Sequence, residues 1–261
     1  MTDAADAISL TVVGSSSSIP RPGRACSCYL LRGPGHAIAF DFGTGALSNL
    51  RRHMAAEDLD AVVISHMHAD HFLDIVPLRY ALRYGPRTND RRVPLYLPPD
   101  GEAMLRRMTD AFASEPGADY LSHVFDVRTY DPEKPLRIGA AQLRFARTTH
   151  FVPAFAVRYE CDGKSVTYSA DTAPDERVGA LARGTDLFLC EATLLRADVE
   201  THGRGHLRPE EAGLMARDAG VRRLLLTHYG SETSAGEMIA EAGAAFAGEI
   251  SVADDGERLV L

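Results

Sequence analysis

Apolar runs long enough to cross a membrane are missing from this sequence. A spanning helix needs at least about 18 successive apolar residues, and no stretch approaches that length. The opening residues, MTDAADAISL, are acidic and lack the apolar segment of a signal peptide. These absences disfavour a membrane protein and a secreted one, so we expect a cytoplasmic protein that makes no membrane contact.

Cysteine is scarce, and basic residues are outnumbered by acidic ones. Four scattered cysteines in 261 residues are too few for a disulfide framework. Cys26 and Cys28 alternate along an expected strand, where two buried thiols are commoner than a metal site. Lys and Arg total 28 against 36 Asp and Glu, and this net charge of −8 disfavours a large basic surface for nucleic acid.

Repeats and low-complexity blocks are also absent, which argues against a solenoid and against disorder. Hydrophobic residues make up 45% and charged residues 25% of the chain, an ordinary globular balance. A single domain over residues 1–261 is therefore the simplest expectation.

Short β-rich runs open and close the chain, with helical segments between them. Strands are expected at 8–14, 28–32, 37–42, 61–64, 93–99, 124–130, 136–139, 142–148, 154–160, 165–170, 186–192 and 222–228. Helices are expected at 46–55, 72–84 with a kink or restart at Pro77, 101–112, 175–184, 209–220 and 234–246. The Asp-Gly pairs at 162–163 and 255–256 predict two tight hairpins, the second of which ends the chain. This mixture favours two packed sheets with helices outside over one parallel sheet.

Residues 65–71 read SHMHADH, so four metal-competent side chains directly follow a buried strand. His66 and His68 are two residues apart and point the same way in an extended chain, whereas Asp70 and His71 come after the chain turns. Imidazole and carboxylate are good zinc ligands. One ion cannot easily take all four from so short a loop, but two adjacent ions can share them. A chance set of surface histidines is the alternative, and the clustering at a strand end argues against it.

Three further candidate ligands stand where other β-rich runs end. His150, Asp171 and His228 close or follow the runs QLRFARTTH, SVTYSA and RRLLLTH. Sheets that bring these strand ends to one edge would gather all seven side chains.

This order of residues resembles the metallo-β-lactamase superfamily. HMHADH, followed by His150, Asp171 and His228, matches its metal-binding pattern over nearly the whole chain. The resemblance implies an α/β (α+β) fold, an αββα sandwich of two mixed β-sheets flanked by helices, with a two-metal site at one sheet edge. It implies one metal held by His66, His68 and His150, a second held by Asp70, His71 and His228, and Asp171 as the bridge.

The ligand set also indicates the branch and the metals. Lactamases of the superfamily commonly lack a histidine at the position of His71, and its oxygen-reducing diiron branch has an acidic residue in place of His68. A binuclear metal-dependent hydrolase is therefore favoured over a redox protein. Two Zn²⁺ ions are expected, although the same donors accept Mn²⁺ or Fe²⁺.

Three other segments resemble the tRNase Z-like branch: VVGSSSSIPRPGRACSCYLL, CEAT at 190–193, and GHLRPEEAGLMARDAGVRRLLLTHYG. The resemblance implies that His206 donates a proton to the leaving group, that Glu191 orients it, and that Asp70 helps to deprotonate the attacking water. From the residues alone, His206 is explained equally well as a surface-loop histidine.

Departures from that branch narrow the substrate. Cys190 replaces an expected His, and Leu207-Arg208 replaces Ser-Thr. The long tRNA-gripping arm of the branch lies between the third metal His and the bridging Asp, but only a compact pair of expected strands separates His150 from Asp171 here. Together with the acidic net charge, this favours a small or cyclic phosphodiester, cleaved by a hydroxide that bridges the metals, over precursor tRNA.

Several alternatives share the same residues. A lactonase or thioesterase would use the same metals on a carboxyl ester, and an RNA 3′-processing tRNase Z-like nuclease would keep the phosphodiester. A non-catalytic metal-binding scaffold predicts lost ligands, whereas all seven are present. A homodimer is expected from the resemblance only.

Overall fold

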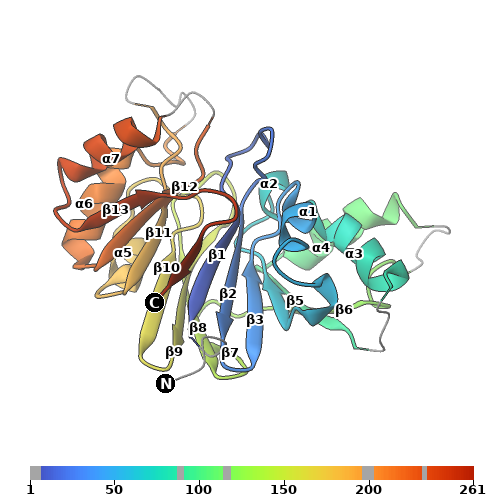
Figure 1. Ribbon diagram of the computed structural model, residues 1–261. Coiled ribbons are helices and arrows are strands. Elements are labelled where there is room, and N and C mark those ends of the chain that lie inside the picture. Colours follow the sequence, from blue (N-terminus) through green and yellow to red (C-terminus); the bar gives the residue numbers. More distant parts are fainter. Residues whose placement is uncertain (1–6, 87–90, 114–118, 196–202, 231–233) are drawn as a thin grey trace.

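Two β-sheets lie face to face between two groups of helices (Figure 1). The structure, a computed structural model, describes residues 7–86, 91–113, 119–195, 203–230 and 234–261. The strands are β1 (Ser9–Gly14), β2 (Cys28–Gly33), β3 (His36–Phe40), β4 (Ala61–Val63), β5 (Val93–Leu97), β6 (Phe125–Thr129), β7 (Leu136–Ile138), β8 (Ala141–Arg147), β9 (Phe155–Cys161), β10 (Lys164–Tyr168), β11 (Leu187–Glu191), β12 (Arg223–Thr227), β13 (Glu249–Val252) and β14 (Arg258–Val260). The helices are α1 (Ala46–Leu50), the 3-10 turn η1 (Ala56–Asp58), α2 (Ala69–Phe72), α3 (Ile75–Tyr84), α4 (Gly101–Asp110), α5 (Glu176–Ala182), α6 (Pro209–Ala219) and α7 (Ala235–Gly243).

Each sheet has seven strands, and the directions of these strands decide at which edge their carboxyl ends lie. The first sheet has the order β14-β1-β2-β3-β4-β5-β6, and the second has the order β13-β12-β11-β10-β9-β8-β7. In the second sheet β10, β11, β12 and β13 are parallel neighbours. Because β9 is antiparallel to both β8 and β10, β8 runs in the same direction as β10. The carboxyl ends of β8, β10, β11 and β12 therefore lie at one edge of this sheet.

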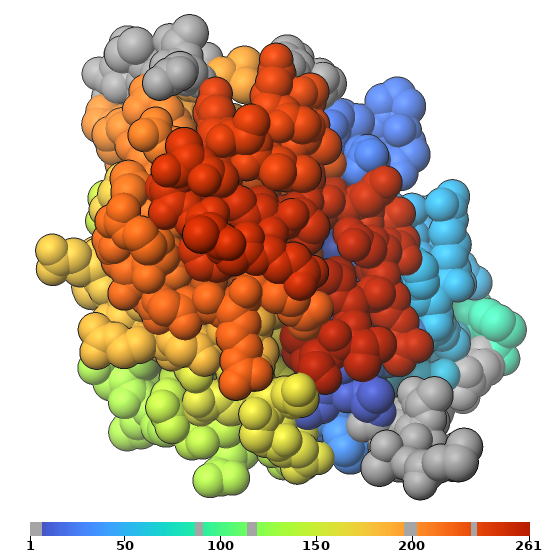
Figure 2. Space-filling view, turned by 60° about the vertical axis from the view of Figure 1, so that its left-hand side comes forward, coloured from blue at the N-terminus to red at the C-terminus, as the bar shows by residue number. Residues whose placement is uncertain are grey.

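Three apolar clusters hold the four layers together. The first lies between the sheets and includes Leu10, Tyr29, Tyr159 and Leu189. The second joins the outer face of the first sheet to α1–α4, and the third joins the outer face of the second sheet to α5–α7. Figure 2 shows this last face, where the orange and red surface belongs to the C-terminal helices and strands. Burial of apolar surface on both faces explains why inner strands such as β3, β4 and β11 are nearly continuous apolar runs, whereas β8 near the edge alternates.

Two tyrosines connect the sheets close to the strand ends. Tyr29 of β2 and Tyr168 of β10 have ring centroids 4.9 Å apart. The Tyr29 hydroxyl lies 2.8 Å from Thr227 Oγ1 at the end of β12, and the Tyr168 hydroxyl donates to Asp41 Oδ2 at 2.8 Å, just beyond β3. Because both phenols are buried, these bonds satisfy polar groups that water cannot reach and fix one sheet relative to the other.

The predicted sandwich of two mixed sheets is confirmed, and most predicted elements are present. The Asp162-Gly163 turn has the two positive φ angles, 46° and 73°, of a tight hairpin between β9 and β10. The helix predicted at 46–55 is shorter, because α1 ends at Leu50. The predicted break near Pro77 lies slightly earlier, since α2 ends at Phe72 and Pro77 falls in the first turn of α3. Pro is tolerated there because the first N–H groups of a helix have no partner within it.

The hairpin predicted at the end of the chain is wrong. β13 pairs with β12 in the second sheet, whereas β14 pairs with β1 in the first. The Asp255 carboxylate accepts hydrogen bonds from the backbone N–H groups of Ser15 and Ala25 and from Asn49 Nδ2. The Asp-Gly pair therefore belongs to a crossover that is tied to the β1–β2 loop. Among the described residues, none of the helices has the length and apolar composition that crossing a bilayer requires.

Gly43 marks the closest approach between the first sheet and the loop that carries the histidines. A Cβ atom on Gly43 would lie 1.9 Å from the Asp70 carbonyl oxygen and 2.9 Å from Cys26 Cβ. We expect Gly43→Ala to lower the free energy of unfolding of the metal-free protein by about 1–3 kcal/mol, because the backbone must shift. Urea unfolding in the presence of a chelator measures this.

Gly179→Ala is the matched control, since a Cβ atom at this position of α5 would meet no other described element within 4 Å. It should leave stability unchanged or raise it by up to about 1 kcal/mol through helix propensity. Equal unfolding midpoints for Gly43→Ala and the wild type would show that the loop adjusts freely.

Candidate metal centre

Seven of the predicted site residues lie together at the edge where the strands of both sheets end. His66 follows β4, His150 follows β8, and Asp171 follows β10. His228 comes directly after β12 with a φ of 56°, and Ala170 beside Asp171 has a φ of 51°. Left-handed backbone costs about 1–3 kcal/mol at residues other than glycine, and here it lets the chain turn sharply so that a side chain points into the edge.

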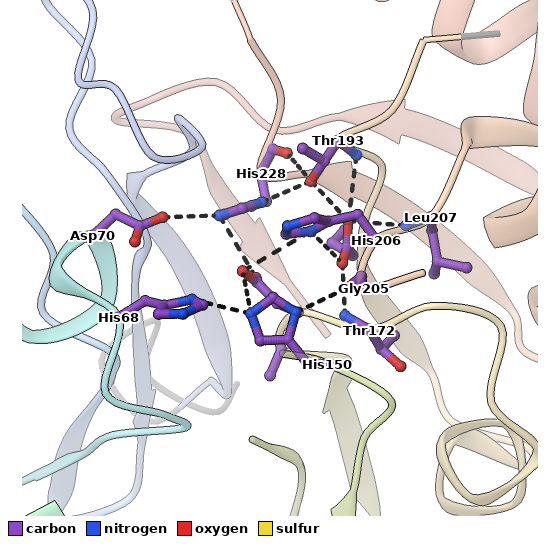
Figure 3. Close-up of polar contacts among 12 residues, drawn as sticks. His68, Asp70, His150, Thr172, Thr193, Gly205, His206, Leu207 and His228 are labelled. Atoms are coloured by element: carbon purple, nitrogen blue, oxygen red, sulfur yellow. Dashed lines mark hydrogen bonds and ion pairs between the residues drawn. The ribbon is translucent and has the colours of Figure 1, made fainter. Parts of the chain in front are cut away.

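The cluster consists of two groups of ligand atoms that share one carboxylate. The first group is His66, His68, His150 and Asp171, and the second is Asp70, His71, Asp171 and His228. Within each group the ligand atoms lie within 4.8 Å of one another. Figure 3 shows His68 and His150 pointing toward each other, and Asp70 pointing toward His228. Asp171 belongs to both groups, so its two oxygens face two neighbouring sites.

Four of these imidazoles have Nδ1 engaged by a protein group, which leaves Nε2 facing inward. His66 Nδ1 lies 3.0 Å from Ser65 Oγ, and His71 Nδ1 lies 2.7 Å from Asp41 Oδ2. His150 Nδ1 donates to the Gly205 carbonyl at 2.9 Å, and His228 Nδ1 lies 2.8 Å from Thr193 Oγ1. Orienting bonds of this kind fix the tautomer and the ring plane of a histidine that binds a metal.

The inward atoms lack suitable partners within the described part of the chain. His66 Nε2 and Asp171 Oδ1 are buried and have no hydrogen-bond partner there. His150 Nε2 lies 3.0 Å from His68 Nδ1, and His71 Nε2 lies 3.3 Å from His228 Nε2. Two facing imidazole nitrogens can share only one proton, whereas divalent cations would satisfy all of these lone pairs. The donor set therefore fits a divalent metal centre.

Burial and neighbouring charges prepare the groups for such cations. Burial, with neighbouring histidines, lowers the pKa of His66 and of His68, so both are neutral imidazoles near pH 7. Burial opposes ionisation of Asp171, but His228 and His71 outweigh it and hold its pKa well below the usual range. Burial would also lower the pKa of His71, but the Asp171 and Asp41 carboxylates raise it well above the usual range. Metal binding at His71 must therefore displace a proton.

Asp41 was not identified from the sequence, which placed it inside the strand expected at 37–42, whereas β3 ends at Phe40 and Asp41 directly follows it. It is fully buried. Its Oδ2 lies 2.7 Å from His71 Nδ1 and accepts from Tyr168 at 2.8 Å, and both of its oxygens accept from Ser65. This one carboxylate thus orients the candidate ligand His71 and the start of the histidine loop. Asp41 contacts Nδ1 of His71 and not Nε2, the atom that faces the other candidate ligands. It is not part of the ligand pattern, so the spacing of that pattern does not predict it.

His206 and Glu191 form a hydrogen-bonded pair beside the two ligand groups. His206 Nδ1 donates to Glu191 Oε1 at 3.0 Å, and the His206 ring lies 5.0 Å from the His150 ring and 5.7 Å from the His228 ring. The Glu191 carboxylate also accepts from the N–H groups of Thr172 and Leu207. Glu191, His206 and His228 also have donor types that could hold a metal, but the oxygens of Glu191 already accept bonds from His206, Thr172 and Leu207.

A family model supplies independent support for this fold. Residues 11–229 match the β-lactamase superfamily domain. The chain belongs to the β-lactamase superfamily. It is thus a metal-dependent hydrolase of that superfamily, as the sequence predicted, and it has a candidate His/Asp site for divalent metal.

Curated relatives cover almost the whole chain. An uncharacterised protein of Mycobacterium tuberculosis is 37% identical over 93% of this chain and 88% of its own length. The probable metallo-hydrolase YhfI of Bacillus subtilis is 30% identical over 95% of this chain and 97% of its own length. Ribonuclease Z of Thermobifida fusca is 31% identical over 97% of this chain and 94% of its own length.

Solved structures support the same fold. The crystal structure of YhfI, a metallo-β-lactamase fold protein, superposes with a TM-score of 0.86 at 28% identity and covers 97% of this chain and 99% of its own. Human tRNase Z, short form, has a TM-score of 0.73 at 21% identity, covers 96% of this chain and 98% of its own, and supports the fold alone.

Asp41→Asn tests how far the centre depends on its buried support. The amide cannot accept every bond that the carboxylate accepts, so His71 loses its fixed orientation. We expect zinc affinity to fall about 10- to 100-fold, measured by competition with a chromophoric chelator. Asp126→Asn, which changes an exposed carboxylate paired with Arg128, is the control and should bind zinc as the wild type does. Unchanged affinity in Asp41→Asn would contradict the positioning role of Asp41.

Proposed function

We propose that this protein is a binuclear metal-dependent phosphodiesterase that hydrolyses a small or cyclic phosphodiester. His66, His68 and His150 would hold one metal, Asp70, His71 and His228 the other, and Asp171 would bridge them. Two Zn²⁺ ions fit the imidazole-rich donor set, and Mn²⁺ or Fe²⁺ would also be accepted. When bound, the metals supply Lewis acidity and make a water acidic enough to act as a nucleophile near neutral pH.

The observation that carries the proposal is the His206–Glu191 pair at the rim of the cluster. The His206 side chain is 18% exposed, whereas that of Glu191 is fully buried. Because Nδ1 of His206 donates to Glu191, we assign to Nε2 the proton that a departing oxygen would receive. An alkoxide is a poor leaving group, so its departure gains much from a positioned acid.

Asp70 is placed for the opposite proton transfer. Its Oδ2 lies 3.2 Å from His228 Nε2 and 3.5 Å from His71 Nε2. Burial opposes ionisation of Asp70, but hydrogen bonds from His228 and His71 outweigh it and hold its pKa well below the usual range, so the carboxylate is ionised. We assign it the proton of the attacking water from its position beside the two ligand groups. The water then adds to phosphorus, one P–O bond breaks, and the leaving oxygen takes its proton from His206.

Three observations favour a small substrate over precursor tRNA. His150 and Asp171 are connected by the compact hairpin of β9 and β10, which gives no space for a long arm at that place. The alignment with ribonuclease Z of Thermobifida fusca runs over 301 positions, more than the 261 residues of this chain, so that enzyme has inserted segments that this chain lacks. The relative's name, a ribonuclease, supports phosphodiester chemistry, while the missing segments and the net charge of −8 argue against a long RNA.

A substrate panel tests the reaction class. After metal analysis, the loaded protein is assayed on bis(p-nitrophenyl) phosphate, cyclic nucleotides, a lactone and a thioester. We expect hydrolysis of the phosphodiesters. Turnover of only the lactone or thioester would identify a carboxyl ester hydrolase, cleavage of precursor tRNA in preference to the small diesters would identify a processing nuclease, and no turnover with full metal content would identify a scaffold.

His206→Ala tests the acid. We expect turnover of a cyclic nucleotide to fall about 10²- to 10⁴-fold. Hydrolysis of bis(p-nitrophenyl) phosphate should fall much less, because nitrophenolate leaves without a proton. Metal content measured in the same preparation separates this effect from a damaged centre. Equal losses on both substrates, with intact metal, would remove His206 from the role of proton donor.

A further inference from the structure

An aromatic side chain stands beside the proposed metal centre with half of its surface exposed. Phe151 directly follows the candidate ligand His150 and is 51% exposed. Single exposed apolar residues are common on protein surfaces. Phe151 is unusual in its position, because the other half of the ring packs against groups of the site itself.

Three contacts hold the ring in place. Its centroid lies 5.2 Å from the His150 ring and 6.0 Å from the His206 ring. A Cβ atom on Gly205 would lie 2.4 Å from Phe151 Cε2, so the ring packs directly on the backbone of Gly205, whose carbonyl also orients His150. Replacement of Gly205 by a larger residue would displace the ring. One side of Phe151 is thus fixed by the site, and the other side faces solvent.

Exposure differs around the centre. His68 is partly exposed and the side chain of Asp70 is 10% exposed, whereas the side chains of His150, Asp171 and His228 are at most 2% exposed. His206 is more accessible, at 18%, and Figure 3 shows it above His150, close to Gly205. A phosphodiester whose leaving oxygen meets His206 would place the substituent on that oxygen near Phe151, because the two rings are 6.0 Å apart.

We propose that Phe151 is a specificity-determining residue whose exposed ring stacks on a planar ring of the substrate, such as a nucleobase. This inference rests on the proposed function, because it concerns the part of the phosphodiester that lies outside the metal centre. A base offers a π-face that stacks on an aromatic side chain whatever its hydrogen-bonding edge, so the preference is for the presence of a base and not for its identity.

Two cyclic phosphodiesters that differ in the base provide the test. Adenosine 2′,3′-cyclic phosphate and glycerol 1,2-cyclic phosphate contain the same five-membered cyclic ester, but only the first has a base. With the zinc-loaded wild type, we expect a higher kcat/KM for the adenosine ester. In Phe151→Ala, that preference should fall about 5- to 100-fold, which is the usual loss when a stacking ring is removed, and it should appear mainly in KM.

Three further variants separate stacking from packing. Phe151→Tyr retains the ring and should retain the preference, whereas Phe151→Leu retains apolar bulk over Gly205 and should lose most of it. Phe112→Ala is the matched control. Phe112 is 50% exposed, as Phe151 is, but it follows α4 and its ring lies beside Tyr120, with 6.1 Å between the centroids, instead of beside a candidate ligand. It should not change the preference. Equal losses on both esters in Phe151→Ala, or a full preference in Phe151→Leu, would overturn the inference.

A binding measurement keeps this inference distinct from the proposed function. Calorimetric titration of the zinc-loaded protein with adenosine 2′-monophosphate and with glycerol 1-phosphate needs no turnover. Phe151→Ala should weaken only the adenosine ligand. If the wild type hydrolyses neither cyclic ester, the proposed reaction fails, while selective binding still supports the role of Phe151. If the wild type binds both monophosphates equally, the role of Phe151 is excluded.

Discussion

The structure depends on a set of imidazole nitrogens that converge around one carboxylate and have too few suitable partners among the described residues. Each of four histidines has Nδ1 held by a neighbour, so its Nε2 points to the same small volume as Asp171. Such an arrangement is unfavourable for a folded chain by itself, because buried acceptors without donors cost free energy. Divalent cations remove that cost, so metal binding and the geometry of the strand ends stabilise each other.

The supporting groups come from both sheets, which makes the centre a property of the whole sandwich. Asp41 and the histidine loop belong to the first sheet, while Asp171, Glu191 and His228 lie at the ends of strands of the second. The buried phenols of Tyr29 and Tyr168 connect the two sets at hydrogen-bond distance. A displacement of one sheet against the other would separate the two ligand groups. The packing between the sheets is therefore as important for the chemistry as the ligands are.

Sequence reasoning was most successful where local patterns and chemistry agree. SHMHADH lies at the end of a predicted buried strand, and the ligand types are specific, so both the place and the chemistry of the centre could be predicted. His150, Asp171 and His228 required only the further rule that strand ends of a sandwich meet at one edge. The resemblance to a known superfamily added His206 and Glu191, for which the residues alone left two readings open.

The remaining features depend on tertiary contacts that leave no local pattern. Asp41 is one aspartate among many until the fold places it beside His71. Gly205 is recognisable as important only when Phe151 lies on its backbone. The Asp255-Gly256 pair has the composition of a hairpin turn, but pairing of β14 with β1 and the bonds to Ser15 and Ala25 override that preference. A turn motif reports local geometry and cannot report which sheet the next strand joins.

That last crossover also has a consequence for synthesis on the ribosome. β1 is among the first elements made, yet one of its two edges is paired only by β14, near residue 260. At translation speeds of roughly 5–20 residues per second, that edge stays open for tens of seconds on the nascent chain. An open apolar strand edge invites pairing with other chains. The first sheet therefore completes this edge only after β14 has been made, and until then β1 can pair with the wrong strand.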